Sequence, residues 1–123
     1  MEEIHTHSAP EAIGPYSQAI RSGNLVFTSG QIPISPATGE LAGDDILSQA
    51  EQVMKNIQAV LSAAGSGLER AVKTTCFLAD MSDFAQFNQV YAKYFTQKPA
   101  RSCVAVKELP KRVLCEVEVI AEV

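Results

Sequence analysis

The chain has 123 residues, of which 46% are hydrophobic and 20% charged, and a formal net charge of -4. This length and composition predict a single soluble globular domain over residues 1–123 and exclude disordered, fibrous and membrane-embedded classes. The negative charge disfavours a phosphate-binding surface, and no apolar stretch is long enough to span a bilayer. We therefore expect neither a nucleic-acid partner nor a membrane partner.

The N-terminal segment begins with acidic and polar residues rather than with the basic start and apolar run of a secretory signal. A cytoplasmic protein is therefore expected. A loop rich in turn-forming residues follows. Residues 17–21 and 25–29 are then predicted to be two strands, because residues 22–24 (SGN) supply the turn chemistry of a hairpin.

A long amphipathic helix is predicted after a second turn region. Asp44 and Asp45 offer an N-cap, and Gly65 is placed to end the helix. Between them, apolar residues recur at intervals of three and four and form one stripe, made of Ile46, Leu47, Ala50, Val53, Met54, Ile57, Val60, Leu61 and Ala64.

Three further strands and a second helix complete the pattern. The strands are predicted at residues 71–78, 102–106 and 114–123. Ser82 is expected to cap a helix whose stripe is Phe84, Phe87, Tyr91, Tyr94 and Phe95. The last strand alternates between an apolar face and a face of mixed acidic and apolar character, with Glu116, Glu118 and Glu122 beside Leu114 and Ile120.

About six strands and two helices predict an α+β domain with a mixed sheet, in which the helices can cover only one face. The other face must then meet water or another subunit. We therefore expect a cyclic homo-oligomer with polar clefts between subunits.

The motifs of several familiar enzyme classes are absent. The sequence contains no zinc-ligand spacing, glycine-rich phosphate loop, Gly-x-Ser-x-Gly elbow or His-Glu-x-x-His motif. His5 and His7 lack a Cys, Asp or Glu partner at ligand spacing, so they indicate a solvated tail, and no metal is expected. Cys76, Cys103 and Cys115 lie in apolar runs and indicate reduced, packed thiols.

Arg101 and Glu116 are charged residues in predicted strands whose neighbours are apolar. Isolated charges seldom occupy such positions without a partner. A structural salt bridge or a solvent-facing edge would explain both. Alternatively, the planar guanidinium of Arg101 would bind a substrate carboxylate while Glu116 positions a water molecule. The pattern alone does not choose between these interpretations.

Ordered motifs along the chain carry a resemblance to a known family: residues 12–18 (AIGPYSQ), 28–33 (TSGQIP), 99–104 (PARSCV) and 109–111 (LPK). In these motifs, and on into the last strand, the chain resembles the Rid (reactive-intermediate deaminase) family, also called the YjgF family. The resemblance covers essentially the whole chain. It implies a fold similar to that of Bacillus-type chorismate mutase, a homotrimer with three active sites in the clefts between subunits.

The resemblance also implies an activity. Rid proteins hydrolyse small 2-imino acids, such as 2-iminobutanoate and 2-iminopropanoate, to 2-keto acids without metal or cofactor. The family's carboxylate-binding arginine falls on Arg101 and its water-activating glutamate on Glu116. Its pocket-lining positions fall on Tyr16, Ser29, Gly30, Asn88 and Cys103. Judged without the resemblance, Tyr16 would be a packed turn aromatic, Asn88 an exposed helix residue and Cys103 part of the core.

Alternatives to this function remain open. One is a ribonuclease or translation inhibitor, an activity often attributed to the family, which the acidic charge and the remote histidines disfavour. Another is a non-catalytic or regulatory module that binds small carboxylates through Arg101, whereas Glu116 favours the enzyme. Only Thr96, Gln97 and Lys98 separate Phe95 from Pro99, a connector shorter than in many relatives, which leaves the side-chain preference of the pocket open.

Overall fold

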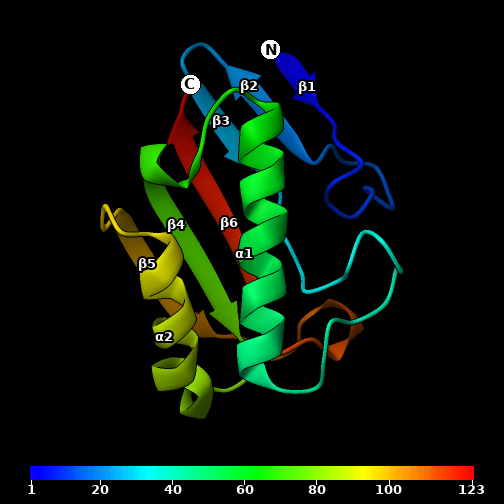
Figure 1. Ribbon diagram of the computed structural model, residues 1–123, viewed down its shortest axis with the longest axis vertical. Helices are drawn as coiled ribbons and strands as arrows, with labels where there is room; N and C mark the ends of the chain where they lie inside the picture. The colour runs from blue at the N-terminus through cyan, green and yellow to red at the C-terminus, as the bar shows by residue number, and fades with distance from the viewer.

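The computed structural model describes residues 1–123 and contains six strands and two α-helices (Figure 1). In chain order these are β1 (Glu2–Ile4), β2 (Ala19–Ser22), β3 (Leu25–Thr28), α1 (Ile46–Ala63), β4 (Ala71–Leu78), α2 (Phe84–Tyr94), β5 (Ala100–Ala105) and β6 (Cys115–Glu122). Short 3₁₀ turns precede β4, α2 and β6, at Leu68–Arg70, Met81–Asp83 and Pro110–Arg112. Neither α-helix combines the length and the apolar character that crossing a membrane requires.

The strands form one mixed sheet in the order β1-β2-β3-β6-β4-β5. Strands β4 and β5 run parallel, with α2 as the crossover between them, and every other neighbouring pair is antiparallel. Both helices pack on the same face of the sheet (Figure 1). The predicted α+β class is therefore confirmed, and β5 is an edge strand.

Helix α1 begins and ends where the sequence predicts. The side chain of Asp45 accepts a hydrogen bond from the backbone N–H of Ser48, and Gly65, with a φ of 80°, follows the last turn. The predicted stripe is buried against the sheet, except for Leu47, which is 37% exposed. Burial of this apolar face fixes the helix along the sheet.

The start of helix α2 differs from the prediction. Asp80, not Ser82, supplies the capping side chain, which accepts a hydrogen bond from the backbone N–H of Ser82. This cap serves the 3₁₀ turn Met81–Asp83, which leads directly into α2 without a further side-chain cap. Most of the predicted stripe packs inward, and Val90 is buried with it.

The N-terminal segment is not the free tail that the sequence predicted. Strand β1 pairs with β2, and Ile4 and Ala9 are buried in the core. Glu11 hydrogen-bonds to both His5 and His7. The two histidines therefore have the carboxylate partner that their spacing in the sequence did not reveal, because the loop after β1 folds back on itself.

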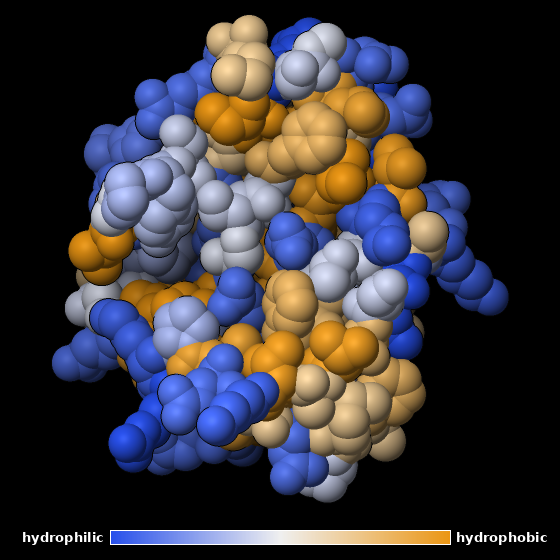
Figure 2. Space-filling view, turned by 180° about the vertical axis from the view of Figure 1, so that it is seen from behind, coloured by the Kyte–Doolittle hydropathy of each residue, from blue (hydrophilic) through white to orange (hydrophobic).

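Strand β6 shows the predicted alternation. Its odd-numbered residues are buried toward the helices, whereas Glu116, Glu118 and Ile120 are half-buried on the opposite face. Phe27 and Val104, which are 41% and 47% exposed, lie on that opposite face because their neighbours in β3 and β5 face the helices. Figure 2 views the molecule from this side and shows apolar patches interspersed with polar side chains. One face of the sheet is thus uncovered.

Candidate active site

Arg101 lies on the edge strand β5 and faces helix α2. Its Nη1 donates a hydrogen bond of 2.7 Å to Oδ1 of Asn88. The guanidinium lies 4.6 Å from the ring centroid of Tyr91 and 5.5 Å from that of Phe84. None of the salt bridges of the chain involves Arg101. Its positive charge is therefore oriented by neighbours but not neutralised by them.

Tyr91 is a site candidate that the apolar stripe of the sequence predicts only as core. Its hydroxyl group shares a buried hydrogen bond of 2.7 Å with Oγ1 of Thr74, which fixes the ring beneath the guanidinium. Burial raises the pKa of Tyr91, so its ring stays neutral and offers an electron-rich face to Arg101. The helical stripe concealed this role, since core packing and a stacking platform require the same spacing.

A hollow of about 330 Å³ opens beside Arg101. Asn88 and Tyr91 line one part of it, and Thr96 and Lys98 of the short connector line another, next to Pro99. Lys98 has a φ of 54°, a left-handed conformation that costs a non-glycine residue about 1–2 kcal/mol. The connector that the sequence singled out therefore borders the pocket of Arg101.

Cys103 follows Arg101 on the same face of β5 and pairs with Cys76 of β4. Burial raises the pKa of the Cys103 thiol, and the charge of Arg101 offsets this only in part. A thiol with a raised pKa is a poor nucleophile, so Cys103 fits a lining role. All three cysteines are free. Cys76 and Cys115 are buried as predicted, whereas Cys103 is half-buried.

Glu116 lies on the uncovered face of the sheet, and its carboxyl group packs against Gly30. The chain after β3 continues beside β6 through backbone hydrogen bonds between Gln31 and Val117. A Cβ atom at Gly30 would lie 2.8 Å from Cδ of Glu116, which is too close for an ordinary contact. Glycine therefore makes room for the carboxyl group.

Burial raises the pKa of Glu116, and the nearby charge of Glu118 raises it further. Both effects disfavour the ionised form. A carboxylate whose pKa is raised binds a proton more strongly, so it is a better general base than an exposed one.

Ser29 positions a loop. Its Oγ donates a hydrogen bond of 2.6 Å to the carbonyl of Ser17, and its backbone N–H donates one of 2.9 Å to the carbonyl of Gln18. These two bonds tie the loop that contains Tyr16 to the end of β3. Ser29 thus holds in place the loop that carries Tyr16, another residue of the predicted pocket.

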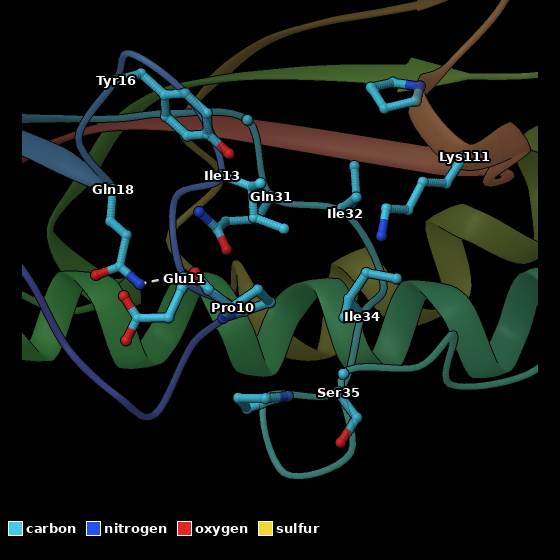
Figure 3. A pocket seen from close by; sticks show the side chains of 14 residues that line it. Pro10, Glu11, Ile13, Tyr16, Gln18, Gln31, Ile32, Ile34, Ser35 and Lys111 are labelled. Carbon is cyan, nitrogen blue, oxygen red and sulfur yellow. Dashed lines mark hydrogen bonds between the residues drawn. The ribbon is translucent and has the colours of Figure 1, made fainter.

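Tyr16 and Gly30 line a cavity of about 390 Å³, with Lys111 near its other end (Figure 3). Tyr16 is 52% exposed, so it is not the packed aromatic of the alternative interpretation. Lys111 and Arg112 have φ values of 56° and 55°. Two successive non-glycine residues in this region indicate strain in the turn at the cavity.

The site residues predicted from the sequence form two groups within one chain. The arginine group, on the helix-covered side, contains Asn88, Arg101 and Cys103. The glutamate group contains Tyr16, Ser29, Gly30 and Glu116. Strand β4 lies between β5 and β6, and Arg101 and Glu116 point to opposite faces of the sheet. One chain therefore does not bring the two charged groups together.

Comparison with known proteins gives consistent matches over the whole chain. A family model described as endoribonuclease L-PSP matches residues 6–123. A RutC family protein of Pyrococcus horikoshii is 55% identical over 121 residues, which cover 98% of this chain and 96% of that protein.

Solved structures match equally well. A putative endoribonuclease of Thermotoga maritima has a TM-score of 0.97 and 48% identity, covering 100% of this chain and 98% of that one. TdcF of E. coli, crystallised with bound serine, has a TM-score of 0.95 and 44% identity, covering 100% of this chain and 99% of that one. The mixed sheet with two helices on one face is thus shared along the full length.

Proposed function

Because the chain belongs to the endoribonuclease L-PSP family, which is the Rid and YjgF family that its motifs resemble, we propose that it hydrolyses small 2-imino acids to 2-keto acids. The proposed substrates are 2-iminobutanoate and 2-iminopropanoate, which arise when dehydratases act on threonine and serine. One protonated imine and one water molecule give one keto acid and one ammonium ion.

The observation that carries this proposal is the unneutralised guanidinium of Arg101. It is oriented by Asn88 and stacked on Tyr91, so its remaining N–H groups are free to bind a carboxylate in the planar, two-bond geometry that arginine favours. The similar protein TdcF was crystallised with serine, a small molecule that, like the proposed substrates, carries a carboxylate group. This supports a carboxylate site at Arg101.

Glu116 is the proposed general base. A protonated imine carbon is already electrophilic, so the reaction needs orientation and proton transfer more than a strong nucleophile. As water bonds to the imine carbon, Glu116 accepts a proton and the C=N electron pair moves to nitrogen. The proton then passes from Glu116 to the amine. The C–N bond breaks while Glu116 accepts the hydroxyl proton, and ammonia leaves to become ammonium with that proton.

The proposed site lies between subunits of a homotrimer, where the arginine group of one chain meets the glutamate group of the next. Their placement on opposite faces of the sheet supports this, since the sheet separates the two groups within one chain. The free edge of β5 and the exposed Phe27 and Val104 on the uncovered face offer surface for such contacts.

Mixed oligomers test the shared site directly. Arg101→Ala and Glu116→Gln chains should each be nearly inactive alone, but a trimer containing both joins an intact Arg101 to an intact Glu116 in about one cleft of three. Coexpression in equal amounts should therefore restore roughly a quarter of the wild-type activity, because about three quarters of random trimers are mixed.

The control for this experiment is the same two preparations mixed without subunit exchange, which should stay inactive. Light scattering should give about three chains per particle for each sample. No recovery in verified mixed trimers would contradict a site shared between neighbouring chains, and a stable active monomer would exclude the shared cleft.

Replacing Gly30 should disturb Glu116 without removing it. We expect Gly30→Ala to lower kcat by about tenfold to a hundredfold, since a displacement of about 1 Å in a catalytic group can cost about a hundredfold. Gly67→Ala is a matched control, because its new Cβ also meets a carboxyl group, that of the exposed Glu69. That side chain can turn into solvent. An equal kcat for Gly30→Ala and wild type would show that Gly30 does not contribute to the catalytic site.

A coupled assay tests the function itself. A dehydratase generates 2-iminobutanoate from threonine, and semicarbazide traps the imine that has not been hydrolysed. The wild-type chain should suppress trapping in proportion to its concentration, and the Arg101→Ala chain should not. Unchanged trapping would contradict the proposal. Binding of small carboxylates without hydrolysis would instead support the non-catalytic module, and RNA cleavage that survives Arg101→Ala would point to a nuclease unrelated to this site.

A further inference from the structure

Three side chains outside the proposed hydrolytic residues gather their potential ligand atoms near the N-terminus. Nε2 of His5 lies 2.8 Å from Oε2 of Glu11, and Nδ1 of His7 lies 2.9 Å from Oε1 of the same group. All three ligand atoms lie within 4.8 Å of one another, and the three side chains are exposed. The chain has only 2 histidines, and both are here.

The buried side chain of Gln18 fixes the loop that carries these residues. It is 2% exposed, and its Oε1 accepts a hydrogen bond of 2.7 Å from the backbone N–H of Thr6. Its Nε2 donates to the carbonyls of Thr6 at 3.0 Å and of Pro10 at 2.8 Å. Ala9 is 1% exposed in the core. The backbone between the histidines and beside Glu11 is thereby held in place while the three side chains project outward.

Ion pairing alone does not explain why His5, His7 and Glu11 gather at one place. Exposed ion pairs contribute about 0–1 kcal/mol each, and two protonated imidazoles with ring centroids 4.7 Å apart would repel each other. Two imidazole nitrogens and one carboxylate oxygen converging on one point are, however, a frequent ligand set of zinc.

We propose that His5, His7 and Glu11 bind a divalent transition-metal ion of the zinc class. Zinc accepts imidazole nitrogen at about 2.0–2.1 Å and carboxylate oxygen at about 2.0–2.2 Å, which sets tetrahedral ligand atoms about 3.3 Å apart. The two histidine–glutamate separations of 2.8 and 2.9 Å, and the remaining one of at most 4.8 Å, differ from this value by no more than rotations of exposed side chains can supply. Magnesium and calcium prefer all-oxygen sites and do not suit two imidazoles.

The ion would lie at the wall of the cavity that Tyr16 and Gly30 line, because Glu11 lines the same cavity (Figure 3). Its three ligands leave a fourth position for water or an external ligand. None of the three belongs to the arginine or the glutamate group. The inference therefore does not depend on the proposed hydrolysis, and its test measures metal binding rather than activity.

Titration of the untagged, metal-free full-length protein with zinc at neutral pH tests the site. Calorimetry should show about one zinc ion per chain, as the three-ligand geometry requires. The His5→Gln/His7→Gln variant should bind at least about tenfold more weakly, since even outer-shell changes cost about ten- to a hundredfold in metal affinity. Glu11→Gln should act in the same direction. Glu69→Gln, which alters an exposed carboxylate elsewhere, is the matched control and should bind like wild type.

The imidazole resonances give a second readout that does not depend on a variant. Both histidine ring signals in the NMR spectrum of the wild-type protein should shift with stoichiometric zinc and stay unchanged with magnesium. Zinc binding of undiminished affinity in the double histidine variant would overturn the proposal, because it would assign the ion to other groups. Histidine ring signals that do not shift with stoichiometric zinc would also overturn the proposal.

Discussion

Replacing Arg101 with alanine should abolish efficient capture of 2-imino acids while leaving the chain folded. The lost contact is a charge-assisted, two-bond interaction with the substrate carboxylate, and hydrogen bonds to charged groups contribute about 1.5–3 kcal/mol each. KM should therefore rise by about a hundredfold or more, and kcat should fall as well if the imine carbon is displaced from Glu116. Steady-state kinetics in the semicarbazide assay measure both constants.

Two further variants test how much the positive charge and the planar shape of the Arg101 guanidinium each contribute to carboxylate binding, and whether the effect is specific to Arg101. Arg101→Lys keeps the positive charge but loses the planar fork, so its KM should fall between those of wild type and Arg101→Ala. Arg70→Ala removes an exposed arginine after helix α1 and should leave KM unchanged. The cation–π contact between Arg101 and Tyr91 contributes about 0.5–2 kcal/mol, so thermal stability should fall only modestly. An Arg101→Ala protein with wild-type KM would contradict carboxylate binding by Arg101. An Arg101→Ala protein that unfolds would instead indicate a structural role.

The elements predicted best are those whose signals are local. Helix α1 combines a capping aspartate, a continuous apolar stripe and a terminal glycine, and all three act within one segment. Strand β4 covers the predicted residues 71–78 because β-branched residues and alternation coincide there. These features depend little on what the rest of the chain does.

The sequence predictions are wrong where contacts between distant residues, or competition between nearby ones, determine the structure. Ser82 and Asp80 both suit a helix cap, and the extra 3₁₀ turn before α2 selects Asp80. Strand β1 forms because the sheet offers the edge of β2, which the three residues of β1 do not signal by themselves. Glu11 meets the histidines where the intervening loop folds back, and hydrogen bonds from Gln18 to Thr6 and Pro10 hold that loop.

The candidate site was predictable as a set of residues but not as an arrangement. A charged residue in an apolar strand marks Arg101 and Glu116 without an alignment. Whether the two side chains face each other depends on the strand order β6-β4-β5 and on which face of the sheet each residue occupies. The pairing and register between strands decide both. The opposite orientation of the two residues is therefore a finding of the structure, and it makes the shared cleft a specific hypothesis.

Glu116→Gln should have the largest effect on turnover. Glutamine keeps the size and hydrogen-bonding capacity of the side chain beside Gly30 but cannot accept a proton, so kcat should fall by about a hundredfold or more, the scale of general acid–base catalysis. KM should change little, because Arg101 still binds the carboxylate. Single-turnover measurements at saturating imine separate this loss of chemistry from weaker binding.

The pH dependence identifies the base independently of the size of that loss. Burial and the charge of Glu118 raise the pKa of Glu116 above its ordinary value of 4.5, and the base acts only when ionised. In the wild type, kcat/KM should fall as the pH drops through this raised pKa, and Glu116→Gln should lack that acid limb. Glu118→Gln is the matched control on the same face: it should keep the neutral-pH rate and move the acid limb to lower pH, because it removes a charge that disfavours ionisation of Glu116. A Glu116→Gln protein with the wild-type rate and acid limb would exclude the general base and leave orientation at Arg101 as the source of catalysis.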